Sequence, residues 1–110
     1  MAKLERNIYT DFHALLLRIE QGILSGSVSA SLEDSSDFVS VAARCSVRVF
    51  ERFSYRGGNR RSMPVTLVQG RPEEPVHLSA ITAGGSQAMF FKINTFGEQA
   101  FLDKLAELLP

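Results

Sequence analysis

The chain has 110 residues, of which 45% are hydrophobic and 22% charged, and its 12 basic and 12 acidic residues give a formal net charge of zero. This length is that of one ordinary domain, and the composition excludes a disordered chain. Zero net charge argues against a polybasic nucleic-acid-binding protein, although a local basic patch is compatible with it. We therefore predict a single domain over residues 1–110.

The cysteine content and the apolar segments indicate the compartment. A single cysteine, Cys45, excludes an internal disulfide and a metal site made of several cysteines. No apolar segment typical of a secretory signal follows the N-terminal charges, and no apolar run approaches the roughly 18 residues that cross a bilayer. We expect a cytoplasmic protein with no membrane partner.

The segment from about Asp11 to Gln21 has apolar residues at spacings of three and four, which is typical of an amphipathic helix. Thr10 or Asp11 can cap its start, because a side-chain oxygen can accept from the free amides of the first turn. Gly22 and Gly26 offer two places for it to end. Its predicted buried face consists of Phe12, Leu15, Leu16, Ile19 and Ile23.

A second helix is predicted from about Gly97 to Leu109. Thr95 and Glu98 have the spacing of a capping box at its start. Its wide apolar face, which we expect to pack on a sheet, consists of Phe101, Leu102, Leu105, Leu108 and Leu109.

Between the helical segments the apolar period changes to two, which is typical of β-strands. The segment Arg44–Arg56 is ambiguous, because arginines recur at every fourth position, but its β-branched and aromatic residues favour a strand. Gly57-Gly58-Asn59 and Gly84-Gly85-Ser86 are typical of hairpin turns, since glycine and asparagine adopt positive φ. The predicted strands are Lys3–Tyr9, Ser27–Glu33, Arg44–Arg56, Met63–Gln69, Val76–Ala83 and Gln87–Ile93.

The predicted order of elements is β-α-β-β-β-β-β-α. Sequential strands joined by short turns form an antiparallel meander, and two amphipathic helices must bury their apolar faces against it. We therefore predict an α+β domain with two layers, in which a curved antiparallel sheet carries both helices on one face.

Three segments, Ser25–Asp34, His77–Gln87 and Phe90–Glu98, resemble those of a known family. They are similar to a family of small bacterial proteins described only as a domain of unknown function, and the similarity extends over nearly the whole chain. Its most distinctive part is Ala83–Glu98. The resemblance implies a bacterial cytosolic protein of one compact domain and implies no activity. The element order also resembles the helix-grip fold and the repeat of the TATA-box-binding protein, which is an analogy of fold alone.

The motifs typical of enzymes are not recognisable in this sequence. His13 and His77 do not lie at a spacing typical of metal ligands. Ser86 follows two glycines, but a nucleophile elbow needs glycines on both sides of the serine and a helix after it. Cys45 lies inside a predicted strand, where a free cysteine is usually a small core residue. We identify no catalytic residue and expect no cofactor and no metal.

The two glycine turns form one candidate site. Every second turn of a meander lies at the same end of the sheet, so we expect these turns to be neighbours. Backbone amides and arginines together suit phosphate or carboxylate, while the alternative is a pair of ordinary hairpin loops with solvated arginines. The candidate anion-binding residues are Arg56, Arg60, Arg61, Gly84, Gly85, Ser86 and Gln87.

The outer face of the sheet is a second candidate. If Val47, Val49 and Phe53 point towards the helices, the alternate residues of the strand face outwards. The expected outer residues are Arg44, Ser46, Arg48, Phe50, Arg52, Thr66, Val68, His77, Ser79, Ile81, Phe90 and Lys92. Arginine with aromatic residues suits a nucleic acid or a protein interface, and zero net charge without an RNA-binding motif favours the interface. A plain solvated sheet is the other interpretation. The candidate interface residues are Arg48, Phe50, Val68, Ile81 and Phe90.

Glu51 conflicts with this alternation, which places it on the inner face between Val49 and Phe53. A bulge could turn it outwards, an arginine could pair with it, or it could orient a ligand in an internal pocket. A bulge or a local pairing is favoured, because burying an unpaired carboxylate is costly.

These observations predict a non-catalytic binding or assembly module that forms a homodimer through the outer sheet face and has no nucleic-acid partner. The alternative is a small-molecule or anion-binding protein, with its ligand between the sheet and the C-terminal helix or at the glycine turns.

Overall fold

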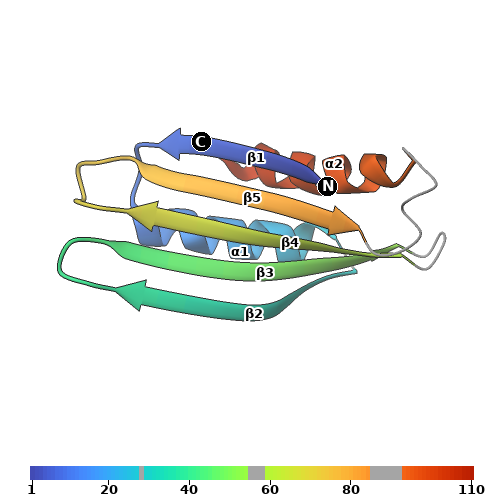
Figure 1. Cartoon of the computed structure of the whole chain (residues 1–110), viewed down its shortest axis with the longest axis horizontal. Coiled ribbons are helices and arrows are strands. Elements are labelled where there is room, and N and C mark those ends of the chain that lie inside the picture. The colour runs from blue at the N-terminus through green and yellow to red at the C-terminus, as the bar shows by residue number, and fades with distance from the viewer. Residues whose placement is uncertain (28, 55–58, 85–92) are drawn as a thin grey trace.

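The computed structural model describes all residues except 28, 55–58 and 85–92. The described elements are β1 (Ala2–Ile8), α1 (Phe12–Gly26), β2 (Ala30–Val39), β3 (Arg44–Ser54), β4 (Asn59–Gln69), β5 (Val76–Gly84) and α2 (Ile93–Leu108). The strands form one antiparallel sheet in the order β1-β5-β4-β3-β2, and both helices lie on the same face of it (Figure 1). The predicted α+β class and the placement of both helices on one face of an antiparallel sheet are confirmed, and the described elements follow the predicted order, with the last predicted strand outside the described residues.

The chain crosses from one edge of the sheet to the other through α1. β1 pairs with β5, with Ala2 opposite Thr82 and Ile8 opposite Val76, whereas β2 lies at the far edge beside β3. β4 is therefore the central strand. The strand predicted over Gln87–Ile93 falls outside the described residues, except for Ile93, with which α2 begins.

The first helix is capped by Asp11, one of the two predicted residues. Its side chain accepts a hydrogen bond of 2.8 Å from the backbone nitrogen of Ala14. The helix continues through Gly22 and ends at Gly26. A Cβ atom at Gly22 would overlap the side chain of Leu108, so this glycine allows α1 and α2 to approach closely. The predicted buried face is confirmed for Phe12, Leu15, Leu16, Ile19 and Ile23.

The second helix begins earlier than predicted. It starts at Ile93 rather than Gly97, so Thr95 lies inside the helix and not at its boundary. Glu98 is buried and forms an ion pair with the amino group of Met1. The predicted apolar face is confirmed, since the core includes Phe101, Leu102 and Leu105.

The edge strand β2 continues from the predicted Ser27–Glu33 segment to Val39. Its second half contains Asp34 and Asp37 with two serines, residue types that strands usually avoid. Pairing with β3 nevertheless orders this half, and the register shifts between Leu32 and Asp34. Such a shift is typical of a β-bulge.

The central strand β4 accommodates Pro64 at an interruption in its pairing with β5. The register is continuous on either side, with Ser62 opposite Ala83 and Val65 opposite Ala80, but no pair is formed between them within the described ladder. Proline has no backbone N–H to donate, so it is tolerated where the ladder lacks that bond.

The helices cover the face of β3 opposite to the predicted one. Phe50 is 0% exposed and lies opposite Met63 of β4, which is also 0% exposed. Alternation fixes which residues of a strand share a face, but it does not fix which face the helices cover. The outward placement is therefore wrong for Arg44, Ser46, Arg48, Phe50 and Arg52.

Arginines can occupy this covered face because their guanidinium groups have partners there. The Arg44 guanidinium lies 4.8 Å from the centre of the Phe12 ring. Similarly, Arg52 lies 5.0 Å from the centre of the Phe101 ring. Cation–π contacts of this kind are favourable where the cation is partly desolvated.

Arg48 is buried between two carboxylates. Its Nε donates to Oε2 of Glu20 at 2.5 Å, and its Nη1 donates to Oδ1 of Asp37 at 3.0 Å. Asp37 also accepts a bond of 2.6 Å from Oγ of Ser46. The hydrogen bonds from Ser46 and from Arg48 lower the pKa of Asp37. Burial alone would lower the pKa of Arg48, but its hydrogen bonds to the carboxylates outweigh burial and raise that pKa. This cluster joins β3 to α1 and β2.

Candidate functional site

The face of the sheet opposite the helices, called the open face below, is arranged in rows. Antiparallel pairing places residues of neighbouring strands side by side, and alternate residues share a face. From β2 to β1, the first row is Phe38, Cys45, Val68, His77 and Asn7. The second row is Ser36, Val47, Thr66, Ser79 and Glu5. The third row, continued in register past the gap at Pro64, is Asp34, Val49, Pro64, Ile81 and Lys3.

The centre of these three rows is uncharged, and their charges lie at the edges of the sheet. Beyond the rows, the open face of β3 and β4 carries the ion pair of Glu51 and Arg60. On β3, β4 and β5 these described rows carry apolar, thiol, hydroxyl and imidazole side chains, without Asp, Glu, Lys or Arg. Val68 is 36% exposed and Ile81 is 39% exposed. The charged residues of the rows are Lys3, Glu5 and Asp34. A centre without charged residues and a charged border are typical of a protein–protein interface.

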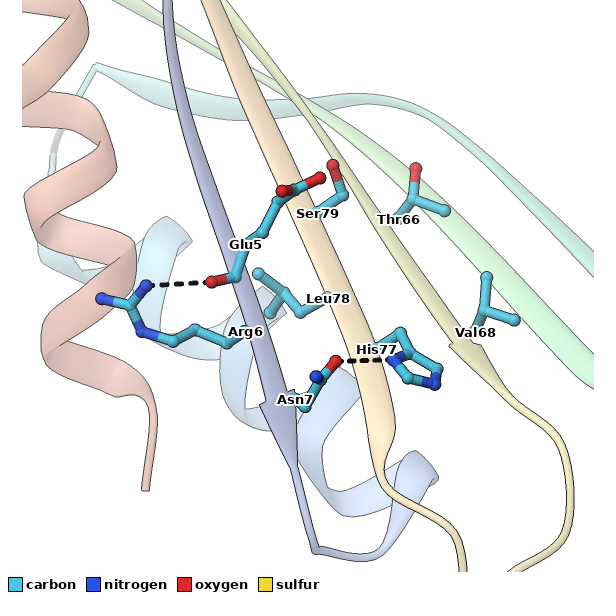
Figure 2. Close-up of a pocket in the computed structure, with 8 residues that line it drawn as sticks. All are labelled: Glu5, Arg6, Asn7, Thr66, Val68, His77, Leu78 and Ser79. Atoms are coloured by element: carbon cyan, nitrogen blue, oxygen red, sulfur yellow. Dashed lines mark hydrogen bonds between the residues drawn. The ribbon is translucent and has the colours of Figure 1, made fainter.

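A hollow of about 650 Å³ lies on the open face over β1, β5 and β4 (Figure 2). Asn7 and His77 point toward one another within it, and Nδ1 of His77 is 2.5 Å from Oδ1 of Asn7. Because an amide oxygen accepts, Nδ1 of the ring donates this bond. The hollow is lined by Glu5, Arg6, Asn7, Thr66, Val68, His77, Leu78 and Ser79.

Phe38 projects from the open face at the opposite edge. It is 69% exposed and lies at the β2 end of the first row. Val39 and Val41 beside it are also exposed, but Val39 alternates to the other face of β2. The first row therefore has a projecting aromatic ring at one edge of the sheet and a hollow at the other edge.

The strand ends that lead into the predicted glycine turns lie at the same end of the sheet, as expected for a meander. Asn59 of β4 lies opposite Ser54 of β3, and Arg61 of β4 lies opposite Gly84 of β5. A Cβ atom at Gly84 would lie 2.7 Å from Oε2 of Glu98, so a larger residue at this position would require the Glu98 carboxylate to shift.

Two of the predicted anion-binding arginines point to opposite faces and do not converge. Nη1 of Arg60 donates to Oε1 of Glu51 at 2.8 Å on the open face, where Oγ of Ser62 also donates to Oε2 at 3.2 Å. Arg61 is buried on the helix-covered face, opposite Arg52 in the register. The other predicted residues Arg56, Gly85, Ser86 and Gln87 lie outside the described residues.

The predicted interface residues are also divided between the open face and the helix-covered face. Val68 and Ile81 lie on the open face, as expected. The placement of Arg48 and Phe50 on that face is wrong, because Phe50 fills the core and Arg48 pairs with carboxylates beneath the sheet. Phe90 and Lys92 lie outside the described residues. The open-face residues that the sequence prediction missed are Phe38, Cys45, Val47 and Val49.

In the part of the chain that the structure describes, three or more His, Cys, Asp or Glu side chains do not gather into a metal site, and neither helix is long and apolar enough to cross a membrane. The family described as "Family of unknown function (DUF6054)" matches residues 1–110. The chain belongs to this family. No significant match was found to a curated protein or to a solved structure.

In this DUF6054 chain, the position of Glu51 indicates which face of β3 the helices cover. The predicted alternation placed Glu51 on the inner face, where an unpaired carboxylate is costly. The reverse assignment places Phe50 in the core and Glu51 on the open face. There Glu51 pairs with Arg60, and pairing with an arginine was one of the predicted alternatives.

Proposed function

We propose that the protein is a non-catalytic assembly module that forms a homodimer by stacking two open faces. The observation that carries this proposal is the uncharged centre of the three rows, with Val68 and Ile81 more than one-third exposed between charged edges. Exposed apolar side chains that are bordered by polar and charged residues mark interaction sites. Two-fold self-association is the commonest symmetric way to cover such a surface.

The area of the open face supports a second copy as the partner. Five strands about 4.8 Å apart and about 30 Å long present roughly 700 Å² per copy, so stacking would remove about 1,400 Å² from water. Stable specific interfaces bury about 1,200–2,000 Å² in total. A second copy of this sheet is therefore a partner of the right size.

The edges of the sheet support stacking over edge-to-edge pairing. β2 combines a register shift with the acidic residues Glu33, Asp34 and Asp37, while β1 carries Lys3 and Glu5. Bulges and charges on edge strands protect against the addition of further strands. The face remains the surface better suited to association.

A second candidate function, anion binding, is favoured by one observation at the glycine-turn end. Arg52 and Arg61 lie opposite one another in the register. The pKa of Arg52 is lowered, mainly by burial and also by the positive charge of Arg61. Two adjacent guanidinium groups suit a phosphate or carboxylate. In contrast, the space between the sheet and α2 is filled by Phe101, Leu102 and Leu105, which argues against a ligand there.

We also propose a bacterial, cytoplasmic location. A homodimer in the cytoplasm of a bacterium fits the single cysteine and the family resemblance, and it requires no cofactor.

The test is the solution mass of two matched variants. Ile81 and Leu24 are both 39% exposed, but Ile81 lies on the open face and Leu24 lies on α1. By light scattering at tens of micromolar, we expect the unmodified chain and Leu24→Asp to be dimers and Ile81→Asp to be a folded monomer. A monomeric unmodified chain would contradict the proposal, and so would a dimer that is split only by Leu24→Asp.

A further inference from the structure

We infer that the two copies are related by a two-fold axis that runs parallel to the strands over β4, so that Phe38 of each copy occupies the hollow of the other. This inference rests on the proposed function and adds the geometry of the contact. Its basis is the first row, where the projecting Phe38 and the hollow beside His77 and Asn7 lie at opposite edges of one sheet.

The sheet order determines what such an axis brings together. β4 is the central strand, so rotation about an axis along it exchanges β1 with β2 and β5 with β3. Each row keeps its position along the axis, and all five strands of both copies overlap. This arrangement gives the largest stacked area of the two-fold axes parallel to the strands.

In the first row, the rotation places Phe38 over Asn7 of the second copy. The hollow there extends across two rows, from His77 and Asn7 to Ser79 and Glu5, and its volume of about 650 Å³ accommodates an aromatic ring. Because the axis is two-fold, the same contact forms twice. Such a self-complementary contact is what an isologous interface requires.

The third row is also complementary under this rotation. Val49 meets Ile81 of the second copy, so apolar side chains meet at the centre of the stack. Asp34 meets Lys3 of the second copy, so opposite charges meet at the border. In the second row Glu5 meets Ser36, which is neutral. Like charges are therefore not opposed in these three rows, and electrostatic complementarity of this kind fixes orientation. Beyond the rows, the rotation brings Arg60 of β4 near its own equivalent, and each Arg60 is paired with Glu51 of its own copy.

Cross-linking tests the axis directly. In a Cys45→Ser background, Phe38→Cys and Asn7→Cys place thiols at opposite edges of one sheet, about 19 Å apart over four strand spacings. Facing sheets lie roughly 10 Å apart, which is too far for a disulfide but within reach of a short bismaleimide. We expect this double variant to give a covalent dimer on a denaturing gel.

Three controls isolate the contact. Phe38→Cys alone and Asn7→Cys alone should not cross-link, because equivalent residues lie at opposite edges of the stack. Val39→Cys combined with Asn7→Cys should not cross-link either, because Val39 is 77% exposed but points to the other face. In addition, Phe38→Ala should weaken dimerisation at least tenfold, because it removes the ring that fills the hollow of the second copy, while Val41→Ala should leave it unchanged.

The outcomes separate this inference from the proposed function. A dimer that is split by Ile81→Asp, but whose Phe38→Cys and Asn7→Cys variant gives no covalent dimer, would overturn the axis and leave the stacked open faces standing. A cross-linked single-cysteine variant would also overturn the axis. An unmodified chain that is monomeric at tens of micromolar would overturn both.

Discussion

The two faces of this sheet differ in a way that residue composition alone does not reveal. The covered face of β3 carries Arg44, Arg48 and Arg52, each with an aromatic ring or a carboxylate as its partner. The open face of the same strand carries valines, and its central rows are uncharged. Guanidinium groups can therefore lie on the covered side of a strand when each one has a partner, and valines can lie on the side that no helix covers.

The largest expected effect separates two neighbouring residues of β3. Phe50→Glu should prevent folding, because it removes a ring worth about 3–5 kcal/mol of packing and buries a charge as well. Val49→Glu should leave a folded monomer, because this side chain lies on the open face. Circular dichroism and light scattering measure both outcomes. A folded, monomeric Phe50→Glu variant would reverse the assignment of the faces.

Phe101→Ala tests the covered face from the helix side. The ring is buried between α2 and the sheet, and the Arg52 guanidinium lies over it. We expect the free energy of unfolding in urea to fall by about 3–5 kcal/mol. The exposed residue Lys104 on the same helix provides the control, since Lys104→Ala should change this free energy by less than about 0.5 kcal/mol. Equal values for the two variants would mean that α2 is not docked through Phe101.

Phosphate binding tests whether Arg61 on the covered face, and not Arg60 on the open face, forms an anion site at the glycine-turn end. If the anion binds on the covered face, phosphate at ten times its dissociation constant should stabilise the fold by about 1.4 kcal/mol. Arg61→Ala should abolish this gain, and Arg60→Ala on the open face should retain it. Thermal unfolding with and without phosphate measures the difference. The same gain in both variants would indicate general salt exclusion instead of a site.

The smallest effect concerns the pH dependence of the Arg48 cluster. The pKa of Asp37 is lowered in the folded chain by its bonds from Ser46 and Arg48. Its contribution to stability is therefore present above the unfolded pKa of about 4 and is lost as the pH falls through the lower folded value. Urea unfolding from about pH 6 to about pH 3 should show a steeper loss for the unmodified chain than for Asp37→Asn. The same dependence of unfolding free energy on pH in both proteins would show that the ionisation of Asp37 does not stabilise the fold.

Sequence reasoning predicted the elements better than their faces. Periodicity identified both helices and the described strands, because the apolar spacing that forms an element is local. β2 was cut short at Glu33, since Asp and Ser disfavour a strand until pairing with β3 orders them. The start of α2 was placed late for a related reason: a helix boundary depends on contacts as well as on local residues.

The candidate site was predicted only in part, because a surface is assembled from distant strands. Val68 and Ile81 were placed correctly, since their strands alternate between clearly apolar and polar residues. Phe50 was misplaced, because both faces of β3 contain large side chains. The groups that stabilise the arginines on the covered face, Phe12 beside Arg44 and Glu20 beside Arg48, come from α1. The hollow beside Asn7 was not predictable without knowing that β1 pairs with β5.

Sedimentation equilibrium of the unmodified chain tests the central claim most directly. The stacked open faces predict a mass twice that of the 12.2-kDa chain at tens of micromolar, dissociating on dilution with a single monomer–dimer constant. A mass of one chain over the whole concentration range would contradict the account and leave the open face as solvated sheet.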